Sequence, residues 1–308
     1  MAEMLYARDV YGKTLVELGK QSPEVVVLDA DLSGSTRTSV FAKEFPNRFF
    51  NFGVAEQNMM ATAAGLASCG KIVFASTFAM FATGRAWDQV RNSICYSNLD
   101  VKIVATHAGI TVGPDGASHQ AIEDIAIMRV IPNIHVVVPC DGPETRQALL
   151  AAFTTPGPFY IRLGRAKIPT IEGKKPFQLG KGCILRDGTD VTIVACGIMV
   201  AQALAAQEIL AKQKISARVV NCHTIHPIDT ELLTQCSRQT KGFVVCEEHS
   251  VIGGLSSAIA EALSEVYPTK ILRVGVKNRF GQSGDESDLL REYQLSAEDI
   301  AAAAKQLV

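Results

Sequence analysis

The amino-acid sequence predicts an α/β fold with two doubly wound domains, because short apolar runs alternate with helical patterns along most of the chain. Val25–Leu28 is a continuous apolar run, which is typical of a strand buried on both faces of a parallel sheet, and Val101–Ala105 is expected to form another strand. The alternation lapses over Leu163–Asp187, where Gly, Pro and Lys are frequent, and then resumes. A length of 308 residues fits about two domains.

The lapse in the pattern sets the expected domain boundary. We expect a mostly parallel first domain over residues 1–168, a linker over 169–186 and a smaller α/β domain over 187–308. Ligands bind at the carboxyl ends of parallel strands, so the polar loop Asp29–Thr36, after the first strand, is a candidate binding segment.

The elements of the first domain follow from where apolar runs and helical spacing occur. Helices are expected over Asp9–Gly19, before Pro46, and over Ala55–Ala67, Phe78–Ser97, Ile125–Val130 and Pro143–Phe153. Strands are expected over Val25–Leu28, Arg48–Phe52, Ile72–Ser76, Val101–Ala105, Val136–Val138 and Phe159–Ile161.

The second domain shows the same alternation. Strands are expected over Val191–Ala195, Ala217–Val220, Phe243–Cys246 and Ile271–Val276, and helices over Ala201–Lys212, Leu255–Val266 and Ala297–Leu307. Its isolated polar residues do not demand catalysis, and we interpret them as domain or subunit contacts: His223, His226, Glu248 and His249.

Composition excludes several function classes. Hydrophobic residues make up 47% and charged residues 20% of the chain, which is ordinary for a globular protein. The net charge is −1, and no basic stripe suggests nucleic acid. No apolar run approaches a membrane span, and the first residues lack a signal-peptide pattern. We therefore expect a cytoplasmic protein that binds neither membrane nor nucleic acid.

Cysteine usage agrees with a reducing compartment. The eight cysteines are scattered singly, without a Cys-x-x-Cys pair, so a zinc site is not expected. Buried free thiols are the simpler interpretation.

Two stretches carry candidate chemistry. Glu56 lies at the start of the apolar helix that follows Asn51–Ala55, where a carboxylate can also simply complement the helix dipole. The second stretch, His107–His119, combines two histidines and Asp115 with glycines that permit tight turns. Metal binding is possible for such a loop in principle, although a lone histidine is more often structural.

Three ordered motifs, Asn51–Met60, Ser76–Phe81 and Thr106–Gln120, resemble the pyrimidine-binding domain of transketolase-like enzymes that depend on thiamine diphosphate. The C-terminal third resembles the last domain of the same family. The resemblance implies a mostly parallel pyrimidine-binding fold followed by a smaller transketolase C-terminal domain.

The resemblance assigns a cofactor role to Glu56. In the family, the matching glutamate hydrogen-bonds a ring nitrogen of the cofactor's pyrimidine and so promotes loss of the thiazolium proton. Phe78 and Phe81 match aromatic residues that pack on the pyrimidine ring, although core packing would equally explain them. The family often has a further aromatic just beyond, where this chain has Gly84 and Arg85. Trp87 is an alternative third wall.

The resemblance also implies a sugar-binding role for the loop. His107, Asp115 and His119 match residues that hydrogen-bond the sugar and exchange protons with its hydroxyl groups. His107 discriminates within the family, because deoxyxylulose-phosphate synthases usually lack this histidine. The beta subunits of 2-oxoacid dehydrogenases keep a histidine near position 119 without this Asp-Gly setting.

Cationic residues are candidates for the far end of a phosphorylated sugar. Arg8 and Ser35 match phosphate-contacting positions of transketolase, and Arg165 is a third candidate. Each arginine could instead be a solvated surface residue. Arg162 is an equally good candidate for a structural ion pair, and Arg91 is interpreted as structural.

One expected part of such an enzyme is missing. A Gly-Asp-Gly motif with a later Asn, which holds the magnesium that bridges the diphosphate, is not found. No metal site is therefore predicted on this chain, and Mg²⁺ would be held mainly by a partner.

These inferences predict the C-terminal subunit of a split transketolase of pentose phosphate metabolism. With an N-terminal subunit, in an α2β2-type heterotetramer, it would transfer a two-carbon ketol unit between sugar phosphates. The alternatives are the beta subunit of a 2-oxoacid dehydrogenase, a deoxyxylulose-phosphate-synthase-like enzyme and a non-catalytic regulatory subunit. His107 and Asp115 argue against the dehydrogenase, and the complete set of site residues argues against a regulatory subunit.

Overall fold

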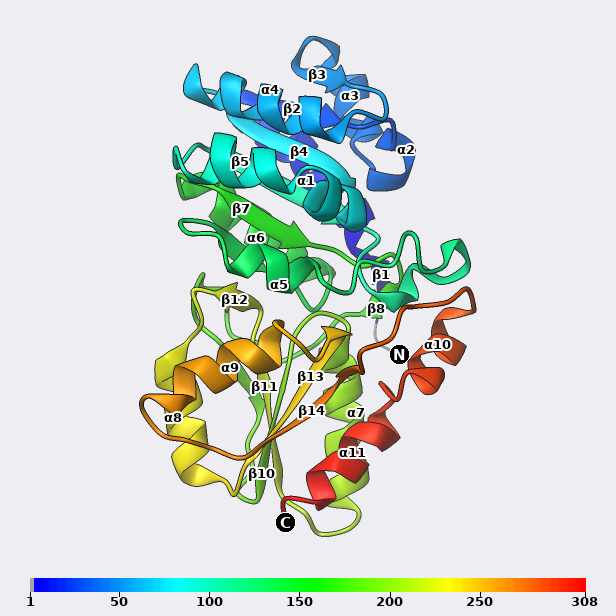
Figure 1. Ribbon diagram of the computed structural model, residues 1–308, viewed down its shortest axis with the longest axis vertical. Coiled ribbons are helices and arrows are strands. Elements are labelled where there is room, and N and C mark those ends of the chain that lie inside the picture. Colours follow the sequence, from blue (N-terminus) through cyan, green and yellow to red (C-terminus); the bar gives the residue numbers. More distant parts are fainter. Residues whose placement is uncertain (1–2) are drawn as a thin grey trace.

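The computed structural model describes residues 3–308 and contains two α/β units, one above the other in Figure 1. The larger sheet has seven strands and the smaller has five, and a two-stranded ribbon lies between them. The predicted fold class, two α/β domains with mostly parallel sheets, is confirmed.

The seven-stranded sheet is parallel except at one edge. Its strands in spatial order are β12 (Thr224–His226), β6 (His135–Val137), β7 (Phe159–Arg162), β5 (Val101–Thr106), β4 (Ile72–Phe78), β2 (Val25–Asp29) and β3 (Phe49–Asn51). Every residue of β2 and β5 is buried, as the continuous apolar run Val25–Leu28 predicted for β2, and in β5 this includes Lys102.

Helices cover both faces of this sheet. Side chains alternate along each strand, so each strand packs against helices on both faces. Val25 and Val27 of β2 pack with Leu15, whereas Val26 and Leu28 pack with Met59 on the opposite face. The α-helices of the unit are α1 (Ala7–Gln21), α2 (Ser33–Thr36), α3 (Ser39–Glu44), α4 (Glu56–Ser68), α5 (Asp124–Arg129) and α6 (Gly142–Thr154).

The helix predicted over Phe78–Ser97 is wrong at its start. Strand β4 continues through Phe78, and two π-helical segments follow, η2 (Phe81–Arg85) and η3 (Gln89–Cys95). The remaining short helices of the first unit are 3-10 turns, η1 (Pro46–Arg48) and η4 (Ile110–Asp115). π-Helical turns in globular proteins are often found at functional sites.

The five-stranded sheet of the second unit is also mainly parallel. Its order is β14 (Ile271–Val276), β13 (Phe243–Ser250), β10 (Val191–Ala195), β11 (Ala217–Asn221) and β9 (Cys183–Arg186), with β9 antiparallel. Its helices are α7 (Met199–Ala211), α8 (Thr230–Gln239), α9 (Leu255–Ser264), α10 (Glu286–Glu292) and α11 (Ala297–Lys305).

The two units are joined by more than the connecting chain. Strand β12 follows β11 in the second unit but pairs with β6 at the edge of the first unit's sheet. The antiparallel ribbon of β1 (Met4–Tyr6) and β8 (Lys167–Pro169) pairs Tyr6 with Lys167, so the chain that leads into α1 lies beside the segment that follows β7. One apolar core extends from Met59 in the first unit to Leu255 in the second, so the domains pack tightly.

Of the eight cysteines, seven are buried and Cys69 is exposed, and all are free thiols. Within residues 3–308, no helix is both long and apolar enough to cross a membrane.

Candidate functional site

The candidate site lies at the carboxyl ends of β2, β4, β5 and β7, where loops of a parallel sheet converge. Glu56 begins α4, and its side chain is only 1% exposed. Its two carboxylate oxygens each lie 2.9 Å from Nη1 of Arg85. A buried carboxylate is costly to maintain without a charged partner. The Arg85 guanidinium is this partner for Glu56.

Phe78 and Phe81 lie beside the two histidines of the predicted loop. The Phe78 ring stacks on His107 with centroids 3.8 Å apart, and it lies 6.1 Å from Phe81 in a stacked arrangement. His119 presents its ring edge-on to Phe81 at 5.3 Å. The guanidinium carbon of Arg85 lies 4.5 Å from the centre of the Phe81 ring. Four predicted residues and Arg85 therefore form one contiguous cluster beside Glu56.

His107 is held in a single orientation. It has a left-handed backbone (φ 57°), and its ring contacts Thr106 Oγ1 at 2.9 Å and Arg8 Nη1 at 3.3 Å. Burial, followed by the positive charges of Arg8 and Arg165, lowers the pKa of His107 to about 3.

The rest of the loop is more open. The segment Ile110–Asp115 forms 3-10 turns, and Nη1 of Arg165 supports it by donating to the carbonyl of Val112 at 2.5 Å. Asp115 is exposed, and His119 is half-buried with Nδ1 3.0 Å from Ser118 Oγ. A bound molecule could reach both side chains.

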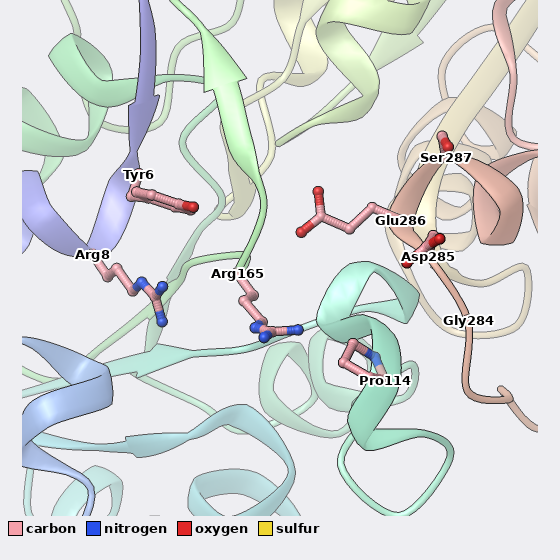
Figure 2. Close-up of a pocket in the computed structure, with 8 residues that line it drawn as sticks. All are labelled: Tyr6, Arg8, Pro114, Arg165, Gly284, Asp285, Glu286 and Ser287. Carbon is pink, nitrogen blue, oxygen red and sulfur yellow. The ribbon is translucent and has the colours of Figure 1, made fainter.

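A pocket of about 500 Å³ opens at the far side of His107, and Figure 2 shows its lining. Arg8 and Arg165 from the first unit face Gly284–Ser287, at the start of α10 in the second unit, with Tyr6 and Pro114 completing the wall. Within residues 3–308, no hydrogen-bond partner reaches the buried Nε atom of Arg8. Two arginines with unused donors make this pocket suited to an anion.

The same pocket contains acidic side chains that were not predicted. Burial raises the pKa of Glu286, while the nearby charges of Arg165 and Arg8 act in the opposite direction. The Arg8 pKa is lowered by burial and by Arg37. The carboxylate of Glu286 points into the pocket, between Tyr6 and Arg165, in Figure 2.

Ser35 does not lie with Arg8 and Arg165, the two arginines that line the pocket. It lies in α2, which is anchored to the end of β2 because Asp29 accepts hydrogen bonds from Leu32 N (2.6 Å) and Thr36 Oγ1 (2.8 Å). In the described part of the chain, Ser35 is not among the residues that line the pocket around Arg8.

The second unit supports the His107–His119 loop through Glu248 of β13. Glu248 accepts a hydrogen bond from the backbone N–H of Thr111 at 2.7 Å, and burial raises the Glu248 pKa. Gly109 has φ 82°, and a Cβ atom there would lie 2.2 Å from the Glu248 carboxyl carbon, so only glycine fits. The interpretation of Glu248 as a domain contact agrees with this geometry.

Arg162 is likewise a domain contact. Its Nε donates to Asp124 Oδ2 at 2.7 Å, and its Nη2 donates to the Glu248 carbonyl at 2.9 Å. The charge of Arg162 and a hydrogen bond from Tyr160 overcome burial and lower the Asp124 pKa. Arg162 is consequently structural, whereas Arg165 remains available to the pocket.

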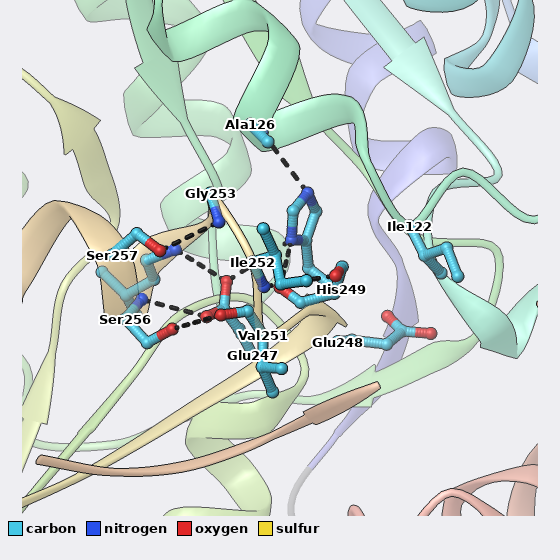
Figure 3. A network of polar contacts seen from close by, with 12 residues as sticks. Ile122, Ala126, Glu247, Glu248, His249, Val251, Ile252, Gly253, Ser256 and Ser257 are labelled. Atoms are coloured by element: carbon cyan, nitrogen blue, oxygen red, sulfur yellow. Dashed lines mark hydrogen bonds and ion pairs between the residues drawn. The ribbon is translucent and has the colours of Figure 1, made fainter. Parts of the chain in front are cut away.

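Neighbouring residues of β13 form a separate polar network, seen in Figure 3. Glu247 points away from Glu248 and accepts from the amides of Leu255 (2.6 Å) and Ser256 (2.9 Å), at the start of α9. His249 accepts from the Ala126 amide through Nε2 and donates from Nδ1 to the carbonyl of Ser250. The contact of Nε2 with Ala126 joins the two units, whereas the contact of Nδ1 with Ser250 lies within β13.

His223 and His226 also join the units. The His223 ring packs on Phe177 at 4.3 Å, and its carbonyl accepts from Val138 N at 2.7 Å. Nδ1 of His226 lies 2.6 Å from the carbonyl of Ile134. These contacts agree with a structural interpretation.

Family comparisons match both units. Residues 3–170 match the family model of the transketolase pyrimidine-binding domain, and residues 180–300 match that of the transketolase C-terminal domain. The chain belongs to the transketolase family. Members of this family use thiamine diphosphate.

Individual relatives span nearly the whole chain. A putative transketolase C-terminal section of Methanocaldococcus jannaschii is 54% identical over 299 residues, covering 96% of this chain and 93% of that protein. A 6-deoxy-6-sulfo-D-fructose transketolase subunit of a Clostridium species is 43% identical, covering 98% of this chain and 94% of that protein. The solved structure of a split-gene transketolase, described as an inactive beta4 tetramer, superposes with a TM-score of 0.90 at 53% identity, covering 99% and 98% of the two chains.

Two residues of the candidate site, Arg85 in the cluster and Glu286 in the pocket, were missed by sequence reasoning. Arg85 was noted only as the residue found where an aromatic is often present, and nothing in the sequence indicated its pairing with Glu56. Glu286 lies 121 residues after Arg165, and no local pattern links the two positions. Within residues 3–308, no group of three or more His, Cys, Asp or Glu is arranged to hold a metal ion.

Proposed function

We propose that this chain is the C-terminal subunit of a split transketolase, which transfers a two-carbon ketol unit between sugar phosphates together with an N-terminal subunit. The observation that carries the proposal is the buried Glu56 carboxylate beside the Phe81 ring, with the loop histidines on one side. A pocket with two arginines lies beyond His107 and would take the anionic end of a substrate.

The residues present fit thiamine diphosphate. A flat heteroaromatic ring needs an apolar face and an in-plane hydrogen-bond partner, and Phe81 and Glu56 offer these side by side. When bound, the cofactor supplies a carbon nucleophile and stabilises the carbanion needed for ketol transfer. Phe78 extends the aromatic surface, although it also supports His107.

In this proposal Glu56 holds a proton at the pyrimidine ring nitrogen. Its burial keeps water away from the carboxylate, so the hydrogen bond to the ring would form in a site of low polarity. His119 is half-buried and close to Phe81, which would let its ring exchange protons with substrate hydroxyl groups. Asp115, exposed on the same loop, would accept hydrogen bonds from the sugar.

His107 has a more restricted role than the predicted proton exchange. With its pKa lowered to about 3, the ring carries no charge near pH 7 and accepts a hydrogen bond from Arg8. We assign it to orienting Arg8 toward the substrate. Arg8 and Arg165 would then bind the phosphate, whereas Ser35 does not line their pocket in the described part of the chain.

The partner subunit would supply the remainder of the cofactor site. The chain lacks the Gly-Asp-Gly pattern, so the diphosphate and its Mg²⁺ are assigned to an N-terminal subunit in an α2β2-type cytoplasmic assembly. Two relatives support this division, because their names describe a transketolase subunit and a transketolase C-terminal section.

Titration calorimetry on the isolated chain, and on the chain mixed with an N-terminal transketolase subunit, tests the proposal. The isolated chain should bind thiamine diphosphate with Mg²⁺ weakly and should show no ketol transfer. The mixture should bind the cofactor and transfer ketol units from a ketose phosphate. Tight Mg²⁺-dependent binding to the isolated chain would contradict the division of the site between two subunits.

A further inference from the structure

Arg85 contacts both groups that would bind a pyrimidine ring, the Glu56 carboxylate and the Phe81 ring. A single nitrogen, Nη1, lies 2.9 Å from both oxygens of Glu56, and the guanidinium carbon lies 4.5 Å from the centre of the Phe81 ring. A guanidinium is planar and delocalised, and it stacks on aromatic faces while its edge donates hydrogen bonds. It therefore occupies the carboxylate and the aromatic surface together.

The local backbone directs Arg85 toward Glu56. Arg85 is the last residue of the π-helical segment η2, and its carbonyl accepts from Gln57 Nε2 at 3.1 Å. The first turn of α4 thus contacts Arg85 at both its backbone and its guanidinium. Trp87, the alternative third wall, is held elsewhere because its Nε1 donates to the Ile127 carbonyl at 2.8 Å.

The two partners differ in how easily they can move. Glu56 is fixed in the interior, with 1% of its side chain exposed, whereas 47% of the Arg85 side chain is exposed. Within residues 3–308, the only side-chain hydrogen bonds of the Arg85 guanidinium are those to Glu56. The Arg85 guanidinium can move into solvent without breaking another hydrogen bond, whereas the Glu56 carboxylate is enclosed by the surrounding protein.

We propose that Arg85 occupies the pyrimidine site in the cofactor-free chain and that the pyrimidine ring of thiamine diphosphate displaces it. This inference rests on the proposed function. Before the cofactor arrives, Arg85 compensates the buried charge of Glu56, which would otherwise lie unpaired in an apolar site. When the cofactor binds, its planar pyrimidine ring takes the place of the planar Arg85 guanidinium as the hydrogen-bond partner of Glu56. Arg85 then moves to the mouth of the site.

The exchange makes Arg85 a competitor of the cofactor, so its removal should strengthen binding. Arg85→Met keeps an unbranched side chain but has neither charge nor donors. In the complex with an N-terminal subunit, Arg85→Met should bind thiamine diphosphate roughly fivefold or more tightly than the unsubstituted complex, because no ion pair has to be broken. Arg91→Met is the matched control, since the exposed Arg91 contacts Asn92 and not Glu56.

A second measurement tests the pair without the cofactor. Urea unfolding of the isolated chain should show that Arg85→Met is destabilising when Glu56 is present and much less so in the Glu56→Gln background. Additive effects of the two substitutions would show that the ion pair does not compensate Glu56, and would overturn the inference.

The cofactor measurement has separate outcomes for the two proposals. Unchanged or weaker cofactor binding by Arg85→Met, with normal binding by the unsubstituted complex, would overturn the displacement of Arg85. An unsubstituted complex that binds no thiamine diphosphate at all would overturn the proposed function itself, and the displacement with it.

Discussion

Nη1 of Arg8 donates a hydrogen bond to Nε2 of His107 across 3.3 Å. Because a guanidinium cannot accept, this imidazole nitrogen carries the lone pair, and Nδ1 carries the proton that reaches Thr106 Oγ1. Protonation of Nε2 would place two positive groups in contact in a buried site. The same contact therefore fixes the ring, its tautomer and the direction of the Arg8 side chain.

His107 should make the folded chain sensitive to acid. Unfolded, the imidazole takes up a proton near pH 6.5, whereas in the folded chain its pKa is about 3. The unfolded chain then binds more protons between these values, so the free energy of unfolding should fall as the pH drops from 6.5 to 3. The contribution is on the order of 5 kcal/mol over that range. His107→Asn should have a shallower slope in urea unfolding, and identical slopes would contradict the buried neutral ring.

The histidines should differ in how they affect turnover. His119→Ala should reduce kcat of the assembled enzyme roughly a hundredfold if its ring exchanges protons with the substrate. His107→Ala should also slow ketol transfer strongly, with a higher KM for the sugar phosphate because Arg8 loses its acceptor. Cofactor affinity, measured by calorimetry, should change little in both. Normal turnover of each ketose phosphate by both variants would show that the two histidines have only a structural role.

The regular elements were largely predictable because their signals are local. Val25–Leu28 is apolar at every position and forms a strand buried on both faces, and Ile271–Val276 was predicted with its observed bounds. Phe78 was misplaced because a short apolar run does not distinguish strand from helix, and its pairing with Thr106 in β5 extends the strand. The three-residue strand β12 depends on an edge provided by the other unit, which no sequence pattern reveals.

The candidate site was predictable only through residue types and motifs. The sequence indicated Glu56, His107 and His119. In the fold, His107 stacks on Phe78, His119 contacts Phe81, and Arg85 links Phe81 to Glu56. Contacts between distant segments could not be predicted from the sequence. Glu286 reaches the site because the two units pack together, and Arg85 reaches it through a π-helical turn. Such contacts depend on tertiary structure, and local periodicity carries no information about them.

Glu286 should limit how strongly the pocket binds a phosphate. A carboxylate beside Arg8 and Arg165 neutralises part of their charge and repels a dianion. Glu286→Gln should lower KM for phosphorylated sugars by roughly threefold to tenfold, with a smaller gain at high salt. Asp288→Asn, an exposed change on the same helix, is the control. Equal KM values for Glu286→Gln and the unsubstituted enzyme would show that the carboxylate does not face the bound anion.

Glu248 should stabilise the loop through the Thr111 amide. Glu248→Ala leaves this buried N–H without an acceptor, which should cost about 2 kcal/mol of unfolding free energy. Glu248→Gln keeps an acceptor oxygen and should lose less. Hydrogen exchange followed by mass spectrometry should show faster exchange of the Thr111 segment in Glu248→Ala alone. Equal protection in both variants would mean that other contacts hold the loop.

We propose that Glu56 activates the cofactor rather than only pairing with Arg85 or complementing the dipole of α4. Glu56→Gln keeps the side-chain shape and a hydrogen-bonding end but removes the carboxylate that can share a proton with the pyrimidine ring. A purely structural role predicts a loss of stability and little change in activity. A role in activation predicts a barrier higher by roughly 3 kcal/mol, about a hundredfold in rate.

Hydrogen–deuterium exchange at the thiazolium carbon of thiamine diphosphate, measured in the complex with the N-terminal subunit, tests this claim most directly. Exchange in Glu56→Gln should be about a hundredfold slower than in the unsubstituted complex at equal cofactor occupancy. Equal exchange rates in the two folded, cofactor-loaded complexes would contradict the assignment of Glu56 as the activating carboxylate.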